Sequence, residues 1–171
     1  MRVVRDIFLF LLTFYIAIVA FMPKTELYYY LEKKLKEKGV VIYNEKFKET
    51  PLALDISNGI ISYQGLDVAR FSLITFKPYL FLNTLEAKNI ELLDMAKKAL
   101  DVDIESLKAK HTILKPFIIN LDIVGSFGEA KGYIDLKEHL VHIDILTPKN
   151  IKPLKRFLRK GEKGWYYESR F

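Results

Sequence analysis

Two histidines three residues apart, His139 and His142, come closest in this chain to a pair of metal ligands. On one face of a helix, two imidazoles at this spacing can share an ion. Here the pair spans a turn signal, Lys137-Glu138-His139, and the start of an alternating strand, so the two rings are expected to point apart. The spacing therefore predicts no metal site.

Acidic and hydroxyl side chains offer two further candidates for chemistry. Asp101, Asp103 and Glu105 alternate with apolar residues, which places three carboxylates on one face of a strand. Such a row could bind a hard cation, but it lacks the glycine and the spacing of a calcium loop, so a solvated strand face is the preferred interpretation. Ser126 stands in Gly125-Ser126-Phe127-Gly128, which is not a nucleophile elbow.

The amino-acid composition excludes several classes of catalytic and metal site. The 171-residue chain has no Cys, which excludes disulfide frameworks, zinc ribbons, iron–sulfur clusters and thiol catalysis. It also lacks a glycine-rich phosphate loop. We therefore expect no catalytic residue, no metal and no cofactor, and a protein that is not an enzyme. Half of the residues are hydrophobic, which excludes a disordered chain and suits one domain with an appendage.

The net charge is concentrated at the C-terminus. Residues 149–171 carry eight basic and two acidic side chains, which account for the whole formal net charge of +6. A nucleic-acid-binding domain needs a basic face on a folded scaffold, so nucleic acid is not expected as a partner. We expect a basic C-terminal tail that is solvated, or that contacts an acidic partner or anionic lipid. The residues proposed for such a contact are Lys155, Arg156, Arg159, Lys160 and Trp165.

The N-terminal segment has the character of a membrane anchor. Residues 7–22 hold 16 positions without a charge, behind Arg2 and Arg5. As a helix this run is about 24 Å long, against a hydrocarbon core of about 30 Å. A cleaved signal peptide needs small residues at −3 and −1, and Ile18 with Ala20 makes a weak site. An uncleaved signal anchor is therefore preferred over a cleaved signal or a core helix, with its N-terminus in the cytosol.

A second helix is predicted over residues 25–38, where leucines recur every four positions and Gly39 supplies the C-cap. Tyr28 and Tyr29 follow the membrane segment closely. They are expected either in the lipid headgroup belt, where aromatic side chains gather, or packed on the domain below. A contact with the membrane or with a partner is therefore assigned to both.

Beyond the second helix the hydrophobic period changes from 3.6 to 2, which indicates strands. Asn58-Gly59 stands between two alternating runs and predicts a hairpin. The other expected elements are strands over 68–76 and 80–93, a short helical stretch over 94–100, and strands from 102 to the end of the sheet at Pro148.

These patterns predict a mainly β protein, in which a transmembrane helix and a short helix precede an antiparallel β domain. The β domain is expected to be a bent sheet, a half-barrel or a sandwich. The expected segments are the cytosolic N-terminus and anchor at 1–22, the membrane-proximal helix at 23–39, the β domain at 40–148 and the basic tail at 149–171.

The helices are too few to cover the apolar face of such a sheet. If the chain closes this face itself, a scaffold is favoured, and if the face stays open, a lipid groove is favoured. The residues expected to line an open groove are Ile119, Leu121, Ile134, Ile143 and Ile145.

Two stretches resemble known envelope proteins. Residues 68–93 resemble the unit of strand, leucine-rich step and strand in AsmA-like proteins. Residues 120–148 resemble the C-terminal repeat of the type II secretion system protein N family, in which a Gly-x-x-x-Gly strand runs into an Asp-Leu turn and returns to a proline. The matching positions here are Gly128, Gly132, Asp135, Leu136 and Pro148.

The resemblance implies a single-pass protein of the bacterial inner membrane, with its N-terminus cytosolic and its soluble domain periplasmic. It further implies an accessory or scaffold subunit of an envelope machine, with type II secretion as the leading case and other protein subunits as partners. The alternative is a module that binds or transfers lipid or lipopolysaccharide through an apolar β groove. The resemblance supplies no catalytic residue.

Overall fold

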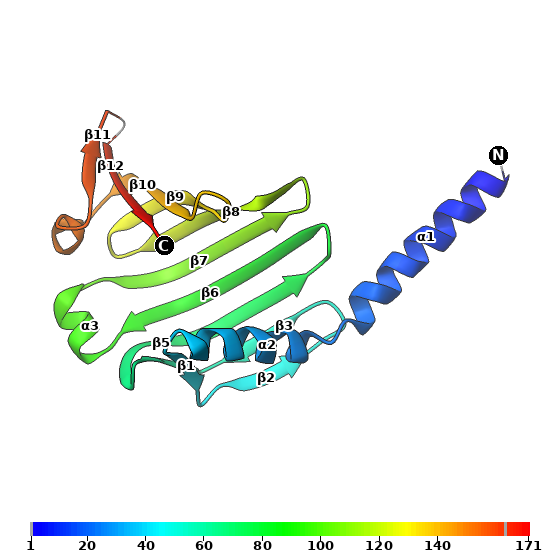
Figure 1. Ribbon diagram of the computed structural model, residues 1–171, viewed down its shortest axis with the longest axis horizontal. Helices are drawn as coiled ribbons and strands as arrows, with labels where there is room; N and C mark the ends of the chain where they lie inside the picture. The colour runs from blue at the N-terminus through cyan, green and yellow to red at the C-terminus, as the bar shows by residue number, and fades with distance from the viewer. Residues whose placement is uncertain (1, 163) are drawn as a thin grey trace.

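The computed structural model describes residues 2–162 and 164–171; Met1 and Lys163, which belong to the expected N- and C-terminal segments, lie outside the described residues. The apolar N-terminal run forms a helix, α1 (Arg2–Phe21), that is long and apolar enough to cross a membrane. Most of its side chains are exposed, and Val19 alone among the residues of α1 is buried. α1 leaves the rest of the molecule at one end (Figure 1).

A second helix follows directly, α2 (Lys24–Glu37), one residue earlier at each end than expected. Pro23 precedes it as the N-cap. Gly39 adopts a φ of 80°, the left-handed region that suits glycine, and its N–H donates to the Lys36 carbonyl at 3.0 Å. The chain can therefore reverse from the helix into the first strand.

Twelve strands and one short helix make up the rest of the described chain. The strands are β1 (Val40–Tyr43), β2 (Lys46–Glu49), β3 (Leu54–Ser57), β4 (Ile60–Tyr63), β5 (Leu66–Pro78), β6 (Leu82–Leu92), β7 (Asp103–Thr112), β8 (Lys115–Gly125), β9 (Gly128–Asp135), β10 (Leu140–Pro148), β11 (Arg159–Gly161) and β12 (Gly164–Arg170). The short helix α3 (Asp94–Ala99) joins β6 to β7, and a 3₁₀ turn, η1 (Lys152–Leu154), follows β10.

All strands join one antiparallel sheet in the order β1-β4-β5-β6-β7-β8-β9-β10-β12-β11, with β3 beside β5 and β2 beside β3. From β5 to β10 each strand pairs with its sequence neighbour. The sheet curves into an open trough, with α2 along one side (Figure 1). The expected fold class, a mainly β chain with an N-terminal apolar helix, a short helix and an antiparallel sheet, is confirmed.

The hairpin expected at Asn58-Gly59 is wrong. β3 and β4 do not pair with each other, and both lie against β5. The dipeptide interrupts one long run instead, with Asn58 at a φ of 59° and its N–H donating to the Ser72 carbonyl at 3.1 Å. A Cβ on Gly59 would lie 2.2 Å from the Phe71 ring, so the glycine is needed for close packing rather than for a turn.

The sheet does not end at Pro148, and the basic segment is not a solvated tail over its described residues, 149–162 and 164–171. β12 pairs with the first part of β10, from Leu140 opposite Arg170 to Asp144 opposite Tyr166, and β11 pairs with β12. The apolar side chains of this basic segment explain its folding, because Leu154, Leu158 and Trp165 pack against the core of the sheet.

Candidate functional site

One face of the sheet is apolar from one side of the trough to the other. In an antiparallel pair, residues directly opposite each other lie on the same face. The strand register therefore aligns two apolar rows across the trough. The first row contains Ile56, Ile74, Ala87, Leu107, Ile123, Ala130 and Ile145. The second contains Leu54, Phe76, Leu85, Ala109, Leu121, Gly132, Ile143 and Tyr167.

All five residues expected to line a groove lie on this face. Leu121 and Ile145 are buried, with 8% and 7% of their surface exposed, because they pack within a cluster formed by β7 to β10. Ile119, Ile134 and Ile143 are half-buried at the edge of the same cluster. The alternation in the sequence therefore assigned the correct face to each of them.

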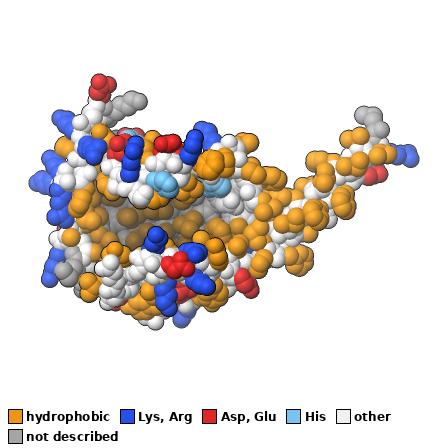
Figure 2. Space-filling model, viewed as in Figure 1, with side chains coloured by type: hydrophobic (Ala, Val, Ile, Leu, Met, Phe, Trp, Pro, Cys, Tyr) orange, Lys and Arg blue, Asp and Glu red, His pale blue; other side chains and the backbone are white. Residues whose placement is uncertain are grey.

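In the described chain, other elements cover the apolar face at one side, where α2 lies, and at the end distant from α1. Near β3, Tyr28 of α2 packs into a second cluster with Ile42, Leu54 and Phe71. Between the two clusters the face is open, and Figure 2 shows an elongated hollow lined by hydrophobic side chains between two rims that carry charged groups. The chain thus leaves a continuous apolar trough open to its surroundings.

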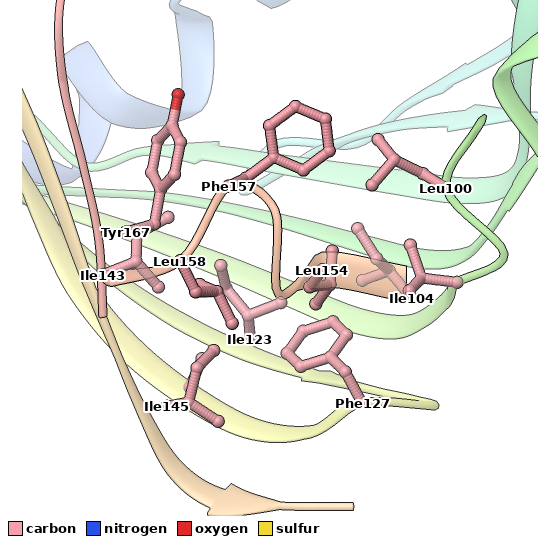
Figure 3. A pocket seen from close by; sticks show the side chains of 12 residues that line it. Leu100, Ile104, Ile123, Phe127, Ile143, Ile145, Leu154, Phe157, Leu158 and Tyr167 are labelled. Atoms are coloured by element: carbon pink, nitrogen blue, oxygen red, sulfur yellow. The ribbon is translucent and has the colours of Figure 1, made fainter. Parts of the chain in front are cut away.

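The end of the trough distant from α1 is closed by the segment that follows β10. Leu154 and Leu158 of this segment face Ile123 and Phe127 of the sheet (Figure 3). Together they form the walls of an apolar pocket of about 380 Å³, which is open on one side and whose lining includes Ile143 and Ile145 of the apolar face. This volume is within the range of about 300–1,000 Å³ that is usual for small-molecule sites.

Sequence patterns did not predict this cover. Its signal was present, because Leu154, Phe157 and Leu158 recur at the spacing of one helical face within the basic segment. The excess of charge around these residues favoured the interpretation as a solvated tail.

The opposite face of the sheet is polar and bears a charged row. Glu86 on β6 pairs with Lys108 on β7, which stands opposite Asp122 on β8. Asp122 also lies 3.6 Å from the amine of Lys131 on β9. The hydrogen bond from Lys108 holds the pKa of the Glu86 carboxyl below its usual range. The two faces of the sheet are therefore chemically distinct.

The structure does not bring the candidate metal-ligating and catalytic residues together into one site. His142 stacks between Tyr133 and Tyr166 on the polar face, whereas the ring of His139 packs against Phe171. Ser126 accepts a hydrogen bond from the Asp103 N–H at 3.1 Å, which fastens the turn between β8 and β9. Among the side chains that the structure describes, no group of three or more from His, Cys, Asp or Glu could hold a metal ion.

The two tyrosines expected at a membrane or partner contact differ in exposure. Tyr28 follows the second of the two expectations, packing on the domain, because it is 8% exposed and lies edge-on against Phe47. Burial and the nearby carboxylates, Glu45 first, raise the pKa of its hydroxyl. Tyr29 is 51% exposed, although its ring also lies 5.6 Å from that of Phe47.

The basic contact residues lie at the end of the sheet distant from α1 (Figure 1). Lys155 sits over the Trp165 ring at 5.5 Å, and Arg156 donates to the Ala99 carbonyl. Arg159 and Lys160 are exposed on β11. This placement does not support a contact between these residues and a membrane crossed by α1, and a contact with an acidic partner stays a prediction.

Comparison with known protein families, with curated proteins and with solved structures found no match for this chain.

Proposed function

We propose that α1 anchors this protein in a membrane and that the trough holds the acyl chains of a membrane lipid, as a binding or transfer module. One observation carries the proposal, namely the open apolar face that runs from β3 to β12 without a second layer over its middle. A contiguous exposed apolar surface marks an interaction site on a soluble domain.

The energetics favour a hydrocarbon ligand. Apolar surface removed from water contributes about 25 cal/mol per Å², and the term needs no directional partner. The cavity beneath Leu154 and Leu158 is lined almost wholly by aliphatic and aromatic side chains, so it offers an acyl chain few polar contacts to satisfy. The charged rims suit a headgroup that stays in water (Figure 2).

The proposed location is the bacterial inner membrane, with the trough on the periplasmic side. Arg2 and Arg5 precede the apolar run of α1, and basic flanks are retained in the cytosol. The other expected role, an accessory or scaffold subunit of type II secretion, stays a prediction.

Lipid in the trough can be detected by photo-crosslinking. The full chain is reconstituted in phosphatidylethanolamine and phosphatidylglycerol vesicles that contain a phospholipid with a diazirine on one acyl chain. Crosslinked peptides are then identified by mass spectrometry. We expect crosslinks on peptides of β7 to β10 as well as on α1, and crosslinks confined to α1 would refute the proposal.

A matched pair of variants separates the trough from the polar face. Ala109 lies in the second apolar row, and Lys110 is its neighbour on the polar face of β7. Ala109→Trp should fill the trough and reduce sheet crosslinks at least about tenfold, which equals about 1.4 kcal/mol of lost binding. Lys110→Trp should leave them unchanged. The thermal unfolding midpoint of each variant is measured as a check on folding. A midpoint within about 5 °C of the parent shows that the variant is folded.

A further inference from the structure

The turns at the α1 end of the sheet expose apolar side chains. Leu80 and Phe81 lie between β5 and β6, Ile113 and Leu114 between β7 and β8, and Leu136 just after β9. Leu114 is 89% exposed and Phe81 is 58% exposed. We call these five residues, with Phe117 on β8, the tip edge.

Backbone hydrogen bonds join the tip edge into one surface. The Ile113 N–H donates to the Phe81 carbonyl at 3.1 Å, and the Leu136 N–H donates to the Phe117 carbonyl at 2.8 Å. The turns are thus held beside each other at one end of the trough. Because these apolar side chains are exposed, they do not stabilise the core of the sheet. A cluster of them therefore indicates a surface that contacts another molecule.

The opposite end of the sheet has a different character. Its connections expose the polar side chains of Lys97, Lys98 and Ser126, together with a few apolar ones, those of Tyr63, Leu66 and Phe157. The cavity cover at residues 151–158 also lies there (Figure 1). The end that meets α1 is the one where exposed apolar side chains gather on neighbouring, hydrogen-bonded turns.

α1 touches the tip edge well before the helix ends. The Tyr15 hydroxyl donates to the Tyr79 carbonyl at 2.8 Å, and the Tyr15 ring stacks on Phe81 at 5.5 Å. Tyr15 precedes the last residue of α1, Phe21, by six positions, which corresponds to about 9 Å along the helix. Each headgroup region is about 5–7 Å thick, so a turn that contacts Tyr15 reaches the boundary with the hydrocarbon when α1 spans the bilayer.

We propose that the tip edge inserts into the bilayer leaflet that α1 leaves, so that the apolar trough opens directly onto lipid. This proposal rests on the membrane anchoring proposed above. Lys115 and Lys137 are exposed beside two of the turns, where their amines reach the phosphates of the headgroup layer. Insertion gives acyl chains a route from the leaflet to the trough that does not cross water.

The absence of cysteine allows a direct test, because any single cysteine can be labelled alone. Leu114→Cys and Phe81→Cys report on the tip edge, and Lys98→Cys on α3 is the control at the opposite end. Leu9→Cys, exposed on α1, is the control for anchoring. Each variant of the full chain carries an environment-sensitive fluorophore and is reconstituted in phosphatidylethanolamine and phosphatidylglycerol vesicles that contain a nitroxide-labelled phospholipid.

The proposal expects strong quenching at Leu114→Cys, Phe81→Cys and Leu9→Cys, and quenching at Lys98→Cys at least about threefold weaker. Equal, weak quenching at Leu114→Cys and Lys98→Cys, with Leu9→Cys strongly quenched, would overturn insertion while leaving the anchor intact. Weak quenching at Leu9→Cys would instead refute the anchoring on which the proposal rests. Thermal unfolding of each labelled variant identifies any that fail to fold.

Discussion

Glu49 at the end of β2 ties the sheet to the junction between α1 and α2. Its carboxylate accepts hydrogen bonds from the N–H groups of Lys24 and Thr25 at 3.3 Å each, and from the Thr25 hydroxyl. The same carboxylate lies 3.8 Å from the amine of Lys24, whose side chain is completely buried. One acidic residue thus caps α2 and neutralises a buried charge, which fixes how the anchor meets the trough.

The two members of this pair should respond differently to substitution. Glu49→Gln leaves the buried ammonium of Lys24 without a counter-charge, and loss of one partner from a buried pair costs about 3 kcal/mol. Lys24→Met keeps the packing volume, and Glu49 retains its hydrogen bonds from Thr25, so the cost should be roughly 1 kcal/mol. Urea unfolding of the two variants in detergent measures both values, and equal costs would contradict the proposed role of the pair.

The free energy of unfolding should decrease as the pH falls, partly because Glu49 becomes protonated. Its hydrogen bond from the Thr25 hydroxyl, the largest cause, lowers the pKa of this carboxyl below the usual 4.5, although burial opposes the shift. The folded state therefore keeps Glu49 ionised where the unfolded state binds a proton. Its contribution is complete above the usual pKa and is lost as the pH falls through the lowered one.

The measurement compares the unfolding midpoints of Glu49→Gln and the parent between about pH 6 and pH 3, a range that spans ordinary carboxyl titration. The variant should lose less stability over this interval. Glu129→Gln, at an exposed position on β9, is the control and should follow the parent. A parallel decline of Glu49→Gln and parent would contradict the assignment.

Gly132 lets β9 and β10 approach closely at the middle of the trough. A Cβ at this position would lie 2.2 Å from the His142 carbonyl oxygen and 2.8 Å from the Ile143 Cα, so the backbones would have to separate. Gly132→Ala should therefore cost about 3 kcal/mol, at the upper end for overpacking. Gly65→Ala has open space and a φ of 83°, and should cost about 1 kcal/mol from backbone strain alone. Urea midpoints compare the two.

The orientation of the anchor can be tested with fusions after Phe171. Because Arg2 and Arg5 are expected to stay in the cytosol, a reporter that is active only outside the cytosol should give signal there. Signal from a cytosolic reporter at the same position would show that the C-terminus is in the cytosol and would contradict the predicted topology. A mature protein shortened by about twenty residues would show that the segment is a cleaved signal.

Local pattern was enough to predict α1, α2 and the apolar faces of β8 to β10. The uncharged run at 7–22 predicted α1, and alternation at 119–145 placed Ile119, Leu121 and Ile143 together on one face. Both inferences succeed because helix and strand periods are properties of consecutive residues. The side of the strand on which a residue lies follows from its neighbours alone.

Strand partners and the openness of the apolar face came from long-range packing. Asn58-Gly59 reads locally as a hairpin, yet β5 is long enough to pair with both flanking strands, and this pairing replaces the turn. Residues 149–171 read as a charged tail, yet burial of Leu154 and Trp165 draws them into the sheet. The curvature that leaves the trough open is a property of the whole twelve-stranded sheet, and period-2 alternation within one strand carries no information about it.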